Sequence, residues 1–142
     1  MLQVKHLLAE KGDGVFSIAP DEPVLVAVRM MADRYVGALL VMQGDELAGI
    51  VSERDYARKV ILKGRSSAET PVRDIMSAPV ITVSPEDTTD TCMRICTERH
   101  VRHLPVVDGK KVVGVLSIGD LVKAVISAQS REIEQLQRYI AG

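Results

Sequence analysis

The sequence predicts a mixed α/β (α+β) fold: two β-α-β-β-α repeats with their sheets packed together about a pseudo-twofold axis, followed by a C-terminal helix. Residues 15–61 and 80–126 align without a gap at a constant offset of 65, and 13 of these 47 positions are identical. Both copies alternate short β-like runs with apolar residues at helical spacing. Neither copy is long enough to bury a stable core alone, so the two are expected to share one.

The first repeat is expected to begin with a short strand in "VFSI" at 15–18. Apolar residues from Leu25 to Tyr35 recur at i, i+3, i+7 and i+10, which predicts a helix with one buried face. The runs "ALLVM" and "LAGIV" predict two strands joined by a turn, and a second helix should start after Ser52.

The second repeat has the same order, from "VITV" through "LPVV" and "VVGVL" to a helix that should start after Ser117. The intervening "DGKK" is a hairpin signal. The polar link before this repeat contains two prolines and predicts one helical turn at 72–76. We therefore expect the first repeat with its N-terminal segment in 1–68, the second with its connecting segment in 69–126, and a helical tail in 127–142.

An apolar stripe follows the tail, because Ile133, Leu136 and Ile140 lie at helical spacing. Such a stripe is expected to dock on the protein itself. Contact with a partner subunit is the less favoured alternative.

The composition is that of an ordinary soluble globular protein, with 46% hydrophobic and 26% charged residues and a formal net charge of −1. The balanced charge and the scarcity of aromatic residues argue against nucleic acid as a partner. No apolar run approaches the length of a membrane span, and the charged N-terminal segment does not match a signal peptide. A cytoplasmic protein with two free thiols is expected, without a membrane partner.

Both repeats carry a G-x-x-S-x-x-D motif, "GIVSERD" at 49–55 and "GVLSIGD" at 114–120. The structural interpretation is a capping box, in which serine and aspartate close the start of a helix. The functional interpretation uses the same geometry, because a helix start with a hydroxyl and a carboxylate suits a phosphorylated sugar. The duplication favours the functional interpretation, since two related helix starts would line two related clefts.

With these motifs, and with the elements "LPVVDG" and "VGALLV", the chain resembles the tandem cystathionine β-synthase (CBS) domain pair, or Bateman module, over residues 5–126. It looks like the stand-alone bacterial type. The resemblance implies clefts between the repeats that bind adenosyl ligands such as AMP, ADP, ATP, NAD(H) or S-adenosylmethionine. It also implies a homodimer in which two chains form a disc of four repeats, and it implies no catalytic cofactor.

The resemblance also assigns binding positions. The motif aspartate would hold the ribose hydroxyls, the motif serine would approach phosphate, and apolar side chains would sandwich adenine. Each motif would face the first strand of the other repeat, and the segment before the second strand would approach base and phosphate. The matching residues are Val15, Phe16, Ser17, Gly37, Ala38, Ile50, Ser52, Arg54, Asp55, Arg73, Val80, Ile81, Thr82, Arg102, His103, Val115, Ser117, Gly119 and Asp120.

The two clefts are not expected to be equivalent. Arg54 and Arg73 predict that the Asp55 cleft binds phosphate more strongly. Gly119 stands where the first motif has Arg54, so the Asp120 cleft is expected to accept a bulkier or less phosphorylated adenosyl group.

Cys92, Cys96, His100 and His103 form C-x3-C-x3-H-x2-H, which suggests a zinc site. The repeat argues against this interpretation, because most of the counterparts in the first copy are apolar, and no metal site is expected. No nucleophile–base–orienter set is recognisable, so no enzyme activity is expected.

The leading functional hypothesis is therefore a regulatory sensor of adenine nucleotides that acts as a homodimer. A separate regulated protein is a further candidate partner. The alternative is a ligand-independent dimerisation scaffold, in which the two motifs serve only as helix caps. An enzyme that uses the thiols or His103 ranks last.

Overall fold

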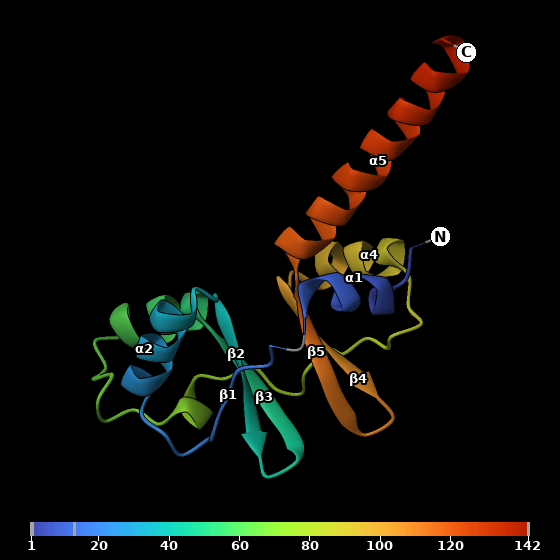
Figure 1. Ribbon diagram of the computed structural model, residues 1–142. Helices are drawn as coiled ribbons and strands as arrows, with labels where there is room; N and C mark the ends of the chain where they lie inside the picture. The colour runs from blue at the N-terminus through green and yellow to red at the C-terminus, as the bar shows by residue number, and fades with distance from the viewer. Residues whose placement is uncertain (1, 13, 142) are drawn as a thin grey trace. The chain divides into compact units, whose positions relative to one another are not determined.

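The mixed α/β fold with a C-terminal helix is confirmed by a computed structural model, which describes residues 2–12 and 14–141 (Figure 1). The elements are, in order, α1 (Val4–Lys11), β1 (Ser17–Ile18), α2 (Val24–Arg34), β2 (Ala38–Gln43), β3 (Glu46–Ser52), α3 (Glu53–Tyr56), a π-helical turn (Ala57–Ile61), a 3₁₀ turn (Val72–Asp74), α4 (Thr89–Arg99), β4 (His103–Asp108), β5 (Lys111–Ser117) and α5 (Ile118–Ala141).

The duplication seen in the sequence recurs in the structure element by element. Helices α2 and α4 begin and end at positions 65 residues apart. Both end in a left-handed residue, Tyr35 and His100, each with φ of 55°. Strands β2 and β4 also bury the same positions: the second, third and fourth residues of each are buried, and the last is exposed. The α-β-β-α order of the repeat is thus a property of both copies.

The first-repeat unit comprises residues 14–81 and 109–112. Strand β2 is the centre of its sheet, parallel to β1 and antiparallel to β3. Helix α2 supplies Val24, Ala27 and Met31 to the core, at most 2% exposed, against Leu39 and Val51 of the strands. The helix is where the spacing predicts it, but the buried face is a different one. Of the predicted face, Leu25 and Val28 are half-buried, Ala32 is exposed and Tyr35 is 96% exposed.

The second-repeat unit comprises residues 1–13, 82–108 and 113–142. Its sheet has the two strands β4 and β5. The counterpart of β1 is reduced to a single parallel bridge between Val83 and Val106, at the positions equivalent to Ile18 and Val41. The short strand expected in "VITV" is therefore one bridge long.

The segment that precedes each repeat packs on the other repeat. The amide of Val72 donates to Glu22 O (2.8 Å), and the amide of Val4 donates to Asp87 O (2.8 Å). Position 87 is the repeat counterpart of 22, so the two bonds are equivalent. Helix α1 and the 3₁₀ turn are therefore matching elements, and the N-terminal segment that we grouped with the first repeat completes the second. The predicted domain limits themselves stay a prediction.

The motif glycines allow these crossing segments to approach the strands. A Cβ at Gly49 would lie 2.6 Å from Met76 Sδ and 3.0 Å from Ser77 O, and a Cβ at Gly114 would lie 2.6 Å from Leu8 Cδ2. These distances are shorter than van der Waals contact. At Gly49 a side chain would meet the backbone of the crossing segment, whereas at Gly114 it would meet only the end of a flexible leucine side chain.

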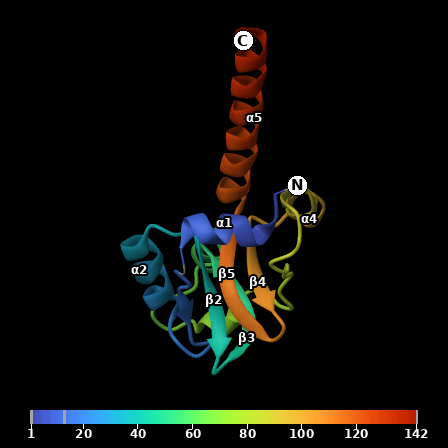
Figure 2. The ribbon, with the colours of Figure 1, turned by 45° about the vertical axis from the view of Figure 1, so that its right-hand side comes forward.

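Helix α5 extends well beyond α1 and α4 (Figures 1 and 2). Its apolar stripe is open to solvent, with Ile133 55%, Leu136 62% and Ile140 82% exposed. The expected docking of this stripe on the protein itself is therefore not seen. The second motif helix and the predicted tail also form one continuous helix. Among residues 2–12 and 14–141, no helix combines the length and apolarity needed to cross a bilayer.

Candidate functional site

The first motif forms a complete capping box. Ser52 is the N-cap of α3, and its Oγ accepts from the Asp55 amide (3.2 Å). Asp55 Oδ2 in turn accepts from the Ser52 amide (2.9 Å) and from its hydroxyl (3.0 Å). The expected cap is confirmed, and it places a carboxylate, 14% exposed, at the end of β3.

The second motif repeats the two backbone bonds of the cap. The Ser117 amide donates to Asp120 Oδ2 (2.8 Å), and the Asp120 amide donates to Ser117 Oγ (3.1 Å). Serine and aspartate thus close the start of α5 as they close the start of α3.

A backbone hydrogen bond ties the segment before the second strand to each motif. The amide of Glu53 donates to Gly37 O (3.0 Å), and the amide of Ile118 donates to Arg102 O (2.8 Å). The β2–β3 register adds Ala38 opposite Ser52. The structure thus brings Gly37 and Ala38 to the first motif, and Arg102 to the second, within their own units.

Each motif aspartate has a lysine partner that the sequence analysis missed. Lys59 Nζ lies 3.1 Å from Asp55 Oδ1 and donates to Ile75 O (2.9 Å). Lys11 Nζ, at the end of α1, lies 2.7 Å from Asp120 Oδ2 and 2.7 Å from Val115 O. The i,i+4 spacing of Asp55 and Lys59 was a signal available in the sequence. No local signal links residues 11 and 120.

The electrostatics of the second motif follow from these contacts. Burial alone would raise the pKa of Asp120, but the hydrogen bonds from Lys11 and Ser117 outweigh it and hold the pKa below its ordinary value. Burial lowers the pKa of His103, and the positive charge of Lys11 lowers it further. The motif therefore combines an ionised carboxylate, a lysine and a neutral imidazole at neutral pH.

The predicted basic residues of the first motif lie at the surface. Arg54 is exposed, as is its counterpart Gly119. Arg73 forms an ion pair with Asp21, so a phosphate would have to compete with that carboxylate. The ring of Phe16 is covered by the Arg34 guanidinium, 5.2 Å from its centroid.

The other predicted contact residues differ in accessibility. Half-buried positions are Val15, Ile50, Val80, Ile81 and Val115, and exposed ones are Ser17 and Thr82. The pairing of each motif with the first strand of the other repeat stays a prediction.

The two cysteines serve as core residues of α4. Cys92 is fully buried, and Cys96 is 4% exposed. Burial, with a smaller contribution from Asp87, raises the pKa of Cys92 to about 11, and burial also raises that of Cys96. Both thiols are therefore protonated and unreactive at neutral pH.

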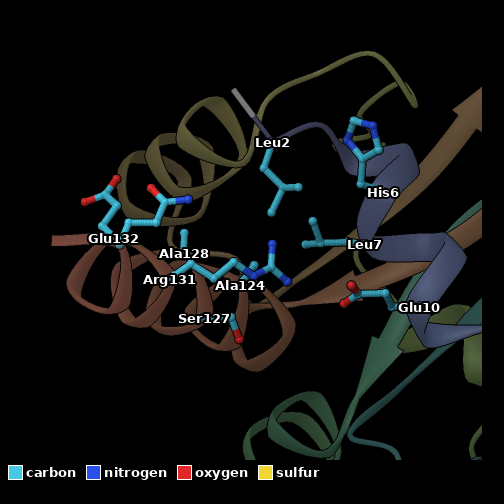
Figure 3. A pocket seen from close by; sticks show the side chains of 10 residues that line it. Leu2, His6, Leu7, Glu10, Ala124, Ser127, Ala128, Arg131 and Glu132 are labelled. Atoms are coloured by element: carbon cyan, nitrogen blue, oxygen red, sulfur yellow. The ribbon is translucent and has the colours of Figure 1, made fainter. Parts of the chain in front are cut away.

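A groove of about 210 Å³ lies between α1 and the middle of α5 (Figure 3). Leu2 and Leu7 face Ala124 and Ala128 across it, and Arg131 extends over it. None of the predicted ligand contacts lines this groove. It is a feature separate from the two motifs.

The sequence model of the CBS domain matches residues 11–62 and 72–127. The mitochondrial CBS domain-containing protein CBSX3 of Arabidopsis thaliana is 44% identical over an alignment of 127 residues, and the match covers 86% of this chain and 62% of that protein. The chain thus spans less than two thirds of this relative. A putative signal-transduction protein with CBS domains from Burkholderia ambifaria is 48% identical and has a TM-score of 0.86, covering 89% of this chain and 96% of that one.

A more distant likeness concerns the fold alone. The CBS domain protein PAE2072 from Pyrobaculum aerophilum, solved in complex with AMP, is 24% identical, with a TM-score of 0.75. The match covers 84% of this chain and 89% of that chain.

Proposed function

The chain belongs to the CBS domain family, and from this premise we propose that it is a regulatory module that binds an adenosyl ligand: AMP, ADP, ATP or NAD(H). The observation that carries the proposal is the pair of motif aspartates, each at a strand end and each held beside a lysine at 3.1 Å or less. The AMP complex of PAE2072, whose fold this chain shares, supports the adenosyl class.

The motif chemistry suits such a ligand. A carboxylate is a strong acceptor for the two ribose hydroxyls, as in dinucleotide sites. The serine hydroxyl and the lysine ammonium can donate to phosphate with charge assistance. The half-buried aliphatic side chains Ile50 and Val115 would hold the flat base.

Arg54 would add phosphate affinity to the Asp55 cleft and make it the stronger phosphate site, as the sequence predicts. Arg73 contributes to this cleft only after it leaves Asp21, because the ion pair occupies its guanidinium. The Asp120 cleft would take a bulkier or less phosphorylated adenosyl group.

A homodimer is part of the proposal. Five apolar side chains on the first helix of each repeat are only half-buried: Leu25, Val26 and Val28 on α2, and Met93 and Ile95 on α4. These apolar side chains, like the stripe on α5, gain stability when a second copy covers them. A ligand would act on the dimer through different affinities for its alternative shapes.

A scaffold without ligand remains the competing function, and one observation favours it. Ser52 and Asp55 satisfy each other in the cap, so helix closure alone explains their presence. Under that hypothesis the motifs have no partner outside the chain.

Thermal melts with AMP, ADP, ATP, NADH and S-adenosylmethionine separate the two functions. A ligand present at 100 times its Kd adds about 2.7 kcal/mol to the free energy of unfolding, which raises the midpoint by several degrees. A mass spectrum under native conditions would identify any adenosyl ligand retained on purification and count the subunits. No shift with any of the five compounds, together with a dimer mass, would favour the scaffold.

A further inference from the structure

Lys11 is held in a fixed place beside the second motif. Its ammonium donates to Val115 O and to Asp120 Oδ2, each at 2.7 Å. The lysine and aspartate side chains are 38% and 27% exposed, so the pair lies at the rim of the unit rather than in its core. Among the described residues, no group donates to Asp120 Oδ1, and no buried side-chain polar atom lacks a partner. Oδ1 is therefore open to solvent.

Helix α1 positions this lysine. Val4 is fully buried and Leu7 is 7% exposed. The Val4 and Lys5 amides donate to Asp87 O (2.8 Å) and Pro85 O (2.9 Å). Leu8 packs on Gly114, one residue before the carbonyl that Lys11 binds. The backbone at residue 11 is thus fixed, while four methylene groups let the ammonium move.

We propose that Lys11 sets the preference of the Asp120 motif for phosphorylated adenosyl ligands over the neutral nucleoside. The proposal rests on the adenosyl-binding function proposed above. The ribose hydroxyls bind the Asp120 carboxylate, and the Lys11 ammonium passes from that carboxylate to the ligand phosphate.

The preference follows from what each ligand offers the ammonium. When the ribose hydroxyls bind the Asp120 carboxylate, the ion pair between Asp120 and Lys11 is weakened. A neutral nucleoside carries no anion that could replace the carboxylate as the partner of Lys11. A phosphate returns a charge-assisted partner of at least equal strength. The Lys11–Asp120 ion pair therefore lowers the affinity for a neutral ligand, and lowers the affinity for a phosphorylated ligand much less.

The first motif holds its lysine in a different way. Lys59 stands one turn after Asp55 on the same helical segment and pairs with Oδ1, the oxygen that the cap leaves free. It is also bound to Ile75 O (2.9 Å). Lys11 instead shares Oδ2 with the cap and arrives from a separate helix. The proposal concerns Lys11, so its test removes the first motif and with it any contribution of Lys59.

The test compares AMP with adenosine by calorimetric titration, in an Asp55→Ala background that leaves only the second motif intact. The variants are Lys11→Met, Lys11→Arg and the matched control Lys5→Met, which removes the same charge from an exposed position of the same helix. Circular dichroism checks that each variant is folded.

In Lys11→Met, we expect AMP to bind about tenfold or more weakly and adenosine to bind equally well or better, because a charge-assisted contact is lost only for AMP. Lys5→Met and Lys11→Arg should keep the parental ratio of the two Kd values within about twofold. The proposal would be overturned if Lys11→Met kept the parental ratio of the two Kd values, or if Lys5→Met lost as much AMP affinity as Lys11→Met. If the background protein bound neither ligand, the proposed function would fail with it, and that outcome is distinct from the other two.

Discussion

The two Ser-x-x-Asp motifs share a cap and differ in what surrounds it. In both, the serine amide donates to the aspartate Oδ2, at 2.9 Å in the first and 2.8 Å in the second. In the first motif, the serine hydroxyl also bonds the carboxylate, and the lysine comes from the next helical turn. In the second, the lysine comes from a helix 109 residues away. Duplication preserved the backbone geometry while the charged groups around it diverged.

This difference shows which parts of the motif are structural. The cap and the glycine are common to both copies, because each copy must start a helix and admit a crossing segment. The cations are not part of the cap, because their positions differ between the copies without loss of the cap. Variants at the shared positions should thus affect mainly stability, and variants at the cations should affect ligand choice.

The largest effect on stability is expected at the glycines. Gly49→Ala places a methyl group 3.0 Å from a backbone oxygen, Ser77 O, as well as against Met76. Gly114→Ala meets only the far end of Leu8, which can move. We expect a loss of about 2–3 kcal/mol for the first and about 1 kcal/mol or less for the second, measured by urea unfolding. Equal losses would show that the two crossing segments are packed alike.

A smaller effect is expected from the caps. Asp55→Ala and Asp120→Ala should each lower the free energy of unfolding by about 1–2 kcal/mol, since each removes a capping acceptor. Only Asp120→Ala also releases Lys11, so hydrogen exchange at the last turn of α1 should rise in that variant alone. Similar exchange in both variants would show that the Lys11 contact does not hold α1.

The contribution of Asp120 should depend on pH. Its pKa is lowered in the folded protein, so its contribution is complete above the ordinary value of 3.8 and is lost as pH falls through the folded value. Parent and Asp120→Ala should therefore differ in urea midpoint at pH 7 and converge in strong acid. A constant difference would contradict this account.

The smallest effect is expected from His103. Its pKa is lowered in the folded protein, so the unfolded chain binds the proton first, and stability falls as pH drops below the ordinary value of 6.5. Between pH 7.5 and 5.5, the free energy of unfolding should therefore fall less in His103→Asn than in the parent. His100→Asn, at an exposed left-handed position that asparagine tolerates, is the control and should keep the parental pH dependence.

Much of the fold could be predicted because it depends on local patterns. The helical spacing from Leu25 to Tyr35 gave α2 to within a residue at each end, and the gapless repeat then fixed α4. The cap at each motif was likewise predictable, since serine and aspartate three residues apart bond each other with little help from the rest of the chain.

The remaining features depend on contacts between distant parts of the chain. Nothing near Val4 indicates that its amide bonds Asp87, so the assignment of α1 to the second repeat could not be predicted. The Lys11–Asp120 pair follows from that placement and was missed with it. The stripe at Ile133, Leu136 and Ile140 was recognised, but its exposure to solvent depends on how far α5 extends beyond the helices that it packs against (Figure 1).

The central claim is that both motif aspartates bind an adenosyl ligand, and stoichiometry tests it most directly. Calorimetric titration with AMP should give two sites per parent chain, and one site each in Asp55→Ala and Asp120→Ala. The site that remains should keep its affinity within about twofold, and the double variant should bind at least tenfold more weakly. A double variant that binds AMP as tightly as the parent would contradict the account.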